Sequence, residues 1–113
     1  AVRSRGLGDV YKRQIIANCK KTKKNKIVIT HGTDTMVKTA KAIASEKIDK
    51  TIILTGAMIP YAFGSSSDGF FNLGCALSYV QTLETGVYIT MHGRYFKWDR
   101  VIKNSTKGYF EKK

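Results

Sequence analysis

Residues 27–36 have the sequence Ile-Val-Ile-Thr-His-Gly-Thr-Asp-Thr-Met, a β-branched run followed directly by a polar turn. The run Ile27–Thr30 predicts a strand, because β-branched side chains pack well on a pleated surface. After the turn, apolar residues recur at helical spacing, while lysines and other polar residues occupy the opposite face. These apolar positions are Met36, Val37, Ala40, Ile43, Ala44 and Ile48. The stretch therefore predicts a strand, a turn and an amphipathic helix.

Strand and helix patterns alternate further along the chain. Thr51–Thr55 and Val87–Met91 are predicted strands, and the helix between them begins after Asp68, whose carboxylate can cap it. We expect this helix to be largely buried, because apolar residues cover most of it: Phe70, Phe71, Leu73, Cys75, Ala76, Leu77 and Val80. Continuous apolar strands separated by helices are typical of a parallel sheet covered on both faces. The sequence therefore predicts an α/β fold, a Rossmann-like three-layer sandwich with a mostly parallel sheet. The polar, aromatic tail predicts only a helix or turn around residues 98–103.

The composition limits the class of protein. The chain has 113 residues, one domain's length, and 42% of them are hydrophobic, too many for an intrinsically disordered chain. Its longest apolar runs are far shorter than the ~20 residues of a membrane-spanning helix, so we expect no membrane partner. Two cysteines cannot form a disulfide framework, which favours a reducing, cytoplasmic compartment. We expect Cys75 in the core, whereas the lysines beside Cys19 can lower the pKa of its thiol.

The net charge of +12 is concentrated near the start of the chain. Residues 1–14 contribute +3, show no helical or strand periodicity and resemble a translated linker. We interpret them as a non-native leader before a domain at 15–113. Five lysines follow within residues 20–26, and we favour a solvated loop or helix end for this lysine run, because no aromatic residues interleave there for base stacking. The alternative is a non-enzymatic basic module that binds nucleic acid or another polyanion.

We expect a ligand site at the turns that follow the strands, because parallel sheets bind ligands beyond the carboxyl ends of their strands. In the turn His31–Thr35, Gly32 allows close backbone approach, Thr33 supplies a hydroxyl and Asp34 a carboxylate. These groups suit a zwitterionic small molecule, although Asp34 or Thr35 can equally cap the following helix. The two histidines have no cysteine near them in sequence, so we expect no metal site.

Several segments resemble the bacterial-type L-asparaginase family, in the family's own order. Residues 27–36 resemble its second signature sequence, and Thr51–Met58 resembles the strand and turn that come next. Ser67-Asp68-Gly69 with Asn72-Leu73 is similar to its Asp-Gly-x-x-Asn-Leu segment, and two later segments, Gly86–Gly93 and Asp99–Asn104, continue the likeness. The resemblance extends from about Ile15 to the end of the chain. Five motifs in order make it specific.

The resemblance implies a reaction and a set of residues. The family hydrolyses asparagine to aspartate and ammonia with a threonine nucleophile, and needs no metal or cofactor. Thr33 and Asp34 match the threonine and aspartate of a catalytic triad, and Lys103 is similar to its lysine. Substrate binding is implied for Gly32, Thr33, Asp34 and the backbone of Ala57. A threonine hydroxyl needs a base, and a lysine can serve when partial burial keeps it neutral part of the time.

The departures from the family pattern are as informative as the matches. The family's primary nucleophile, a threonine in a Thr-Gly-Gly-Thr-Ile turn, has no counterpart here. Its lid tyrosine and the substrate-binding turn that follows are also missing. We therefore expect the carboxyl-terminal two-thirds of a single asparaginase domain, a fragment without the first strand and with little or no activity. The expected partner is a small-molecule amide, and a homo-oligomer is compatible with the resemblance. A same-fold amidase acting on glutamine or another amino-acid amide is a further alternative.

Overall fold

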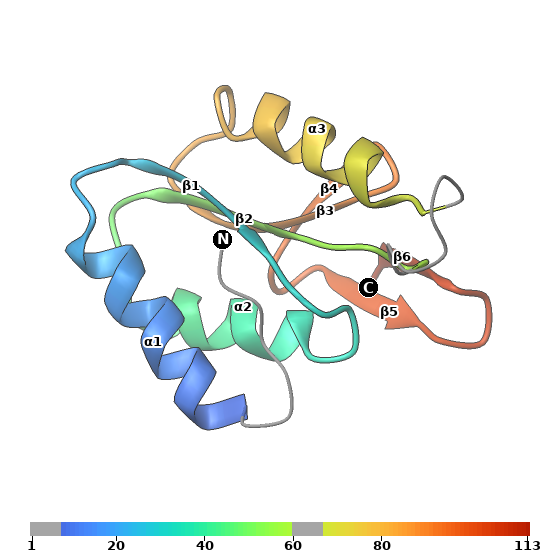
Figure 1. The fold of residues 1–113 in the computed structure, drawn as a ribbon, viewed down its shortest axis with the longest axis horizontal. Helices are drawn as coiled ribbons and strands as arrows, with labels where there is room; N and C mark the ends of the chain where they lie inside the picture. Colours follow the sequence, from blue (N-terminus) through green and yellow to red (C-terminus); the bar gives the residue numbers. More distant parts are fainter. Residues whose placement is uncertain (1–7, 60–66) are drawn as a thin grey trace.

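A computed structural model of the chain describes residues 8–59 and 67–113 (Figure 1). Its centre is a four-stranded sheet with the strand order β1-β2-β3-β4. The first three strands are parallel, and the fourth is antiparallel to the third. The strands are β1 (Lys26–Thr30), β2 (Thr51–Thr55), β3 (Gly86–Met91) and β4 (Arg94–Lys97). All three predicted strands are therefore confirmed to within a residue, and the sheet is mostly parallel as expected.

Helices cover both faces of this sheet. Helices α1 (Gly8–Lys21) and α2 (Met36–Ser45) lie on one face, and α3 (Gly69–Tyr79) lies on the other (Figure 1). The predicted three-layer α/β sandwich is thus confirmed. A separate two-stranded antiparallel sheet, β5 (Val101–Asn104) and β6 (Tyr109–Lys112), follows near the end of the chain.

The core is divided by the sheet into two clusters. The larger one lies between the sheet and the helices α1 and α2, and the smaller one lies beneath α3. Every residue of β2 is buried, as expected for a central strand with neighbours on both sides and both faces covered. The largest fully buried apolar side chains are Ile15, Met36, Ile43, Ile52, Ile53, Leu54, Ile89, Met91 and Val101.

Strand β1 is the edge of the described sheet. The Thr51 amide donates to the Asn25 carbonyl at 2.9 Å, and the His31 amide donates to the Thr55 carbonyl at 2.8 Å. Because backbone groups alternate sides along a strand, the even-numbered residues of β1 direct their N–H and C=O groups away from β2. Within the described residues no strand pairs with that side. A groove of about 370 Å³ lies along it, lined by residues of α1 and β1 and by the turn between them.

Helix α1 corrects one expectation, because residues 8–14 are helical rather than irregular. Ile15 and Cys19 are buried on its inner face, and Tyr11 precedes them by one further turn and is half-buried. The helical spacing of Tyr11, Ile15 and Cys19 extends across residue 14. It is therefore not visible when residues 1–14 are considered apart from the rest of the chain. The first lysines of the lysine run, Lys20 and Lys21, form the end of α1. The interpretation of residues 1–14 as a non-native leader stays a prediction.

Helix α3 corrects a second expectation, because it is not largely buried. Phe70, Phe71 and Leu77 are 77%, 61% and 50% exposed, and Cys75 is half-buried rather than in the core. The buried residues of α3 are instead Gly69, Asn72 and Ala76. The face of α3 that packs on the sheet therefore carries small or polar residues, and the bulky apolar stripe faces outward.

The tail corrects a third expectation. Residues 98–100 form a turn as expected, but 101–104 form strand β5 rather than helix. Strands β3 and β4 form a hairpin joined by His92 and Gly93, whose φ angles of 53° and 82° suit a tight two-residue connection. Phe96 of β4 is buried in the larger core cluster, so its aromatic ring packs inside the protein.

Candidate functional site

The turns after β1 and β2 are in direct contact. Gly56 follows β2, and a Cβ added there would lie 2.2 Å from the carbonyl oxygen of His31. Only a residue without a side chain allows this approach. The contact holds the turn His31–Thr35, which contains Thr33 and Asp34, beside the turn that begins at Gly56 and contains Ala57.

Lys103 reaches this site from β5. Val101, which lies on the same side of β5, is 1% exposed and is part of the larger core cluster. Two residues further along the strand, the Lys103 side chain therefore points toward the start of α2. Its Nζ donates to Thr33 Oγ1 at 2.9 Å and to Asp34 Oδ1 at 2.5 Å. The fold thus brings together the three residues of the expected triad, although about 70 residues of chain separate Lys103 from the other two.

The charges at the site are unevenly shielded. The Lys103 side chain is 16% exposed, whereas that of Asp34 is 89% exposed. The hydrogen bond and the positive charge from Lys103 lower the pKa of Asp34 below its ordinary value, so this carboxylate stays ionised at neutral pH. An ion pair that is so open to water contributes little to stability. Its geometric effect is to hold the ammonium group beside the Thr33 hydroxyl.

The remaining predicted site residues lie on the same two turns. Gly32 is exposed in the turn after β1, and Ala57 is half-buried immediately after Gly56. Thr35 occupies the N-cap position of α2 but makes no capping hydrogen bond with its side chain. The Asp34 carboxylate is bonded to Lys103 rather than to the helix. The capping alternative for these two residues is therefore wrong.

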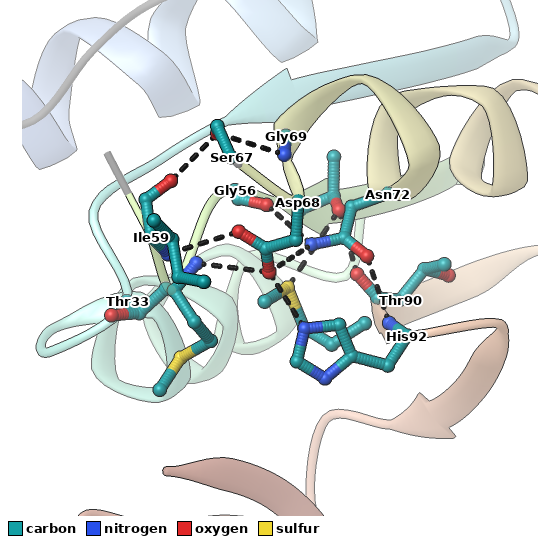
Figure 2. A network of polar contacts seen from close by, with 12 residues as sticks. Thr33, Gly56, Ile59, Ser67, Asp68, Gly69, Asn72, Thr90 and His92 are labelled. Carbon is teal, nitrogen blue, oxygen red and sulfur yellow. Dashed lines mark hydrogen bonds and ion pairs between the residues drawn. The ribbon is translucent and has the colours of Figure 1, made fainter. Parts of the chain in front are cut away.

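A second polar cluster, centred on Asp68, lies next to the turn with Ala57, and sequence reasoning missed it. Figure 2 shows Asp68 between Ile59 and Ser67 on one side and Asn72 and His92 on the other. Asp68 makes no side-chain cap of α3, contrary to the expectation. Instead its Oδ2 accepts from the Met58 amide at 3.1 Å and its Oδ1 from the Ile59 amide at 2.9 Å.

The Asp68 cluster leaves its carboxylate strongly acidic. Burial acts to raise the pKa of Asp68, but hydrogen bonds from Ile59, His92, Met58 and Asn72 outweigh it and lower the pKa to about 2. The available sequence signal is that Asp68 and Asn72 are four residues apart, so they share a face of α3.

Burial shifts the pKa of two further titratable groups. Cys19 is buried in α1, and burial raises the pKa of its thiol, so the expected lowering by neighbouring lysines is wrong. His31 is also buried, which lowers its pKa, and its Nδ1 lies 2.7 Å from the Gly32 carbonyl. In the parts of the chain that the structure describes, no group of three histidine, cysteine or acidic side chains could hold a metal ion. No helix of the same parts is long and apolar enough to cross a membrane.

Comparison with known proteins agrees with this geometry. Residues 9–110 match the family model described as asparaginase, N-terminal. The chain belongs to the asparaginase family. It is 37% identical over 100 residues to a glutaminase-asparaginase of Acinetobacter glutaminasificans, covering 85% of this chain and 29% of that protein. It is 36% identical over 98 residues to L-asparaginase 2 of Escherichia coli K12, covering 83% of this chain and 27% of the relative.

L-asparaginase 1 of Escherichia coli K12 is also similar, with 36% identity over 85 residues. That match covers 73% of this chain and 25% of the relative. The chain thus spans between about a fifth and three tenths of the length of the curated asparaginases that it matches. The match to the family model includes both turns, β5 and the Asp68 cluster, so the whole described site lies inside the asparaginase N-terminal region.

Proposed function

We propose that this chain carries part of the active site of an amidohydrolase that converts L-asparagine to L-aspartate and ammonia. The observation that carries the proposal is the pair of hydrogen bonds from Lys103 to Thr33 and Asp34. A hydroxyl, an amine and a carboxylate in this order are the parts of an activated nucleophile: the amine is the base and the carboxylate orients it. Membership of the asparaginase family supports the same reaction.

In the proposed mechanism Thr33 Oγ1 attacks the side-chain amide carbon of the substrate. Lys103, in its neutral form, accepts the hydroxyl proton and passes it to the leaving nitrogen, which departs as ammonia. Water then attacks the acyl-threonine ester, loses its proton to Lys103 and releases aspartate and the Thr33 hydroxyl. Asp34 keeps the lysine within reach of both proton transfers.

Substrate binding follows from the charges of the same turn. The exposed Asp34 carboxylate can also pair with the α-ammonium group of an amino acid, while the amide of Gly32 and the hydroxyl of Thr33 can donate to its carboxylate. The backbone of Ala57, on the adjacent turn, faces the side-chain amide in this arrangement. These roles suit a small zwitterion with an amide.

The test is ammonia release from L-asparagine by the chain, with Thr33→Ala as the variant and Thr35→Ala as its matched control. Thr35 lies on the same turn and makes no side-chain cap, so its loss should leave turnover unchanged. Because we expect turnover to be low, L-aspartate binding is followed in parallel through the amide NMR signals of Gly32 and Thr33. The absence of both turnover and binding, or equal turnover by Thr33→Ala and wild type, would contradict the proposal.

Glutamine is a second substrate to assay, because two of the similar relatives are named glutaminase-asparaginase. No contact in the described residues distinguishes asparagine from glutamine as a substrate, so the assay should include both. The alternative of a polyanion-binding module is less favoured, since two of the five lysines of the lysine run contact other parts of the chain. Lys20 pairs with Glu46 at 2.5 Å, and Lys26 donates to the Val80 carbonyl at 3.3 Å.

We also propose a cytoplasmic location and self-association. Both cysteines are free thiols, which suits a reducing compartment. The outer side of α3 exposes Phe71 and Leu77, and exposed apolar patches favour contact with another protein surface. Light scattering at increasing concentration tests self-association, and an unchanged monomer mass would contradict it.

A further inference from the structure

The Asp68 cluster is not needed for the chemistry of Lys103 and Thr33, yet it contacts the turn that carries Ala57. Asp68 lies at the start of α3, and its side chain is only 16% exposed. Both of its carboxylate oxygens accept from backbone amides of this turn, at 3.1 Å from Met58 and 2.9 Å from Ile59. A carboxylate that accepts two successive amides fixes the rotation of two successive peptide planes.

The rotation of the first plane determines where the Ala57 carbonyl points. No peptide bond in the described residues is cis, so in the peptide joining Ala57 to Met58 the C=O and the N–H point in opposite directions. Because the Met58 amide points at Asp68, the Ala57 carbonyl points away from α3. The Ala57 carbonyl therefore accepts no hydrogen bond within the Asp68 cluster. Its oxygen lies on the opposite side of the turn, where it can accept one from a ligand.

Asn72 anchors the cluster to the body of the protein. It is fully buried, and its Nδ2 donates to the Gly56 carbonyl and to Asp68 Oδ2, both at 2.9 Å. Its Oδ1 accepts from the His92 amide, also at 2.9 Å. The side-chain amide thus uses both of its N–H groups and its oxygen, and it links the turn after β2 to the turn after β3.

His92 closes the cluster from the β3–β4 hairpin. Its Nε2 lies 2.6 Å from Asp68 Oδ2, and its backbone has the positive φ of the tight hairpin connection. Three segments far apart in the sequence therefore meet on one carboxylate oxygen (Figure 2). Such a fully connected network specifies one geometry more strongly than separate hydrogen bonds do.

We propose that Asp68 is a positioning residue that orients the Ala57 carbonyl to accept a hydrogen bond from the side-chain amide N–H of the substrate, with Asn72 and His92 holding Asp68 in place. The inference rests on the proposed function and deepens it. It assigns a preference for the amide substrate over the acid product. A carbonyl acceptor binds the NH₂ of asparagine, but it repels the carboxylate of aspartate.

The test compares Asp68→Asn with Asp49→Asn in the full chain. Asp49 is an exposed aspartate after α2, so its substitution removes the same charge without touching the cluster. Asn at 68 keeps the size but replaces one acceptor oxygen by a donor, which must release at least one of the two amides. We expect hydrogen exchange at Met58 and Ile59 to accelerate about tenfold, and L-asparagine binding to weaken about tenfold. L-aspartate binding should not weaken, because the Ala57 carbonyl repels its carboxylate and gives it no hydrogen bond.

A second variant guards against a general loss of structure. His92→Asn keeps a residue type that tolerates positive φ and keeps the backbone amide bonded to Asn72, but removes the ring contact with Asp68. It should show the same pattern at smaller amplitude, with an unchanged far-ultraviolet circular dichroism spectrum. If both variants weaken asparagine and aspartate binding equally, or neither changes exchange at Met58 and Ile59, the proposal is overturned. If the wild-type chain binds neither amino acid, the proposed function is overturned. Faster exchange at Met58 and Ile59 in Asp68→Asn would in that case still support the contact between Asp68 and the turn.

Discussion

Replacing Gly56 by alanine tests the contact between the two turns of the site. The added Cβ would lie 2.2 Å from the His31 carbonyl oxygen and 3.1 Å from Met36 Cε. The methionine tip can move, but the backbone oxygen cannot rotate away. The overlap is about 1 Å beyond ordinary contact, and insertions of this kind into packed sites cost about 1–3 kcal/mol, occasionally more. We expect a value near the upper end, about 3 kcal/mol, because the clash is between two backbone segments.

Thermal and urea unfolding measure this cost. For a domain of this size, about 3 kcal/mol corresponds to a fall in Tm of roughly 10–20 °C. The matched control is Gly74→Ala, since Gly74 lies within α3 and an added Cβ there meets nothing within 4 Å. In a helix, alanine in place of glycine should stabilise the protein by about 0.5–1 kcal/mol, so the two substitutions should have opposite signs. A Gly56→Ala variant within about 1 kcal/mol of wild type would refute the reasoning.

The same substitution has a consequence at the site. The oxygen that must move belongs to the peptide between His31 and Gly32, one residue before Thr33. We therefore expect a Gly56→Ala variant that still folds to lengthen the contact between Thr33 and Lys103. An unchanged Thr33 amide signal in the folded variant would show that the turn absorbs the clash elsewhere.

Three further predictions concern titratable groups. Because the pKa of Asp68 is lowered to about 2 in the folded state, its contribution to stability is present above about pH 4 and is lost as the pH falls toward 2; acid unfolding of Asp68→Asn should lack this component. Lys103→Met should return the pKa of Asp34 toward its ordinary value, since Lys103 causes the lowering; titration of the carboxyl carbon by NMR measures this, and an unmoved pKa would contradict the contact. Cys19, being buried with a raised pKa, should react with a maleimide at neutral pH more slowly than the half-buried Cys75, as peptide mass spectrometry would show; faster labelling of Cys19 would place it at the surface.

The layers of the fold were predictable because strands and helices have different apolar periodicities and alternate along the chain. The continuous runs at β1, β2 and β3 indicated a parallel sheet, and all three strands are present. The outward turn of Phe70 and Phe71 was not predictable in the same way. Periodicity identifies an apolar stripe, but which side of a helix faces the sheet also depends on hydrogen bonds, and here Asn72 makes them to two turns.

The candidate site shows a similar division. The residues of one turn, such as Thr33 and Asp34, were accessible from local pattern and resemblance together. Lys103 was named only through the resemblance, because nothing local to β5 indicates where its side chain reaches. The Asp68 cluster was missed because two of its partners are backbone amides, which carry no signal in the sequence, and because the spacing of Asp68 and Asn72 does not reveal that His92 meets them.

The open edge of β1 has a consequence for handling the protein. Three residues, Lys26, Val28 and Thr30, offer backbone donors and acceptors that no described strand uses, and such an edge is a template for pairing between molecules. Lysines at and before this edge, including Lys23 and Lys24, should keep copies apart by mutual repulsion, as charged side chains do at natural sheet edges. Salt shortens the range of that repulsion, to about 3 Å at 1 M. The protein should therefore stay monomeric and soluble in dilute buffer. Concentrated salt, which is often used to release basic proteins from columns, should promote its precipitation.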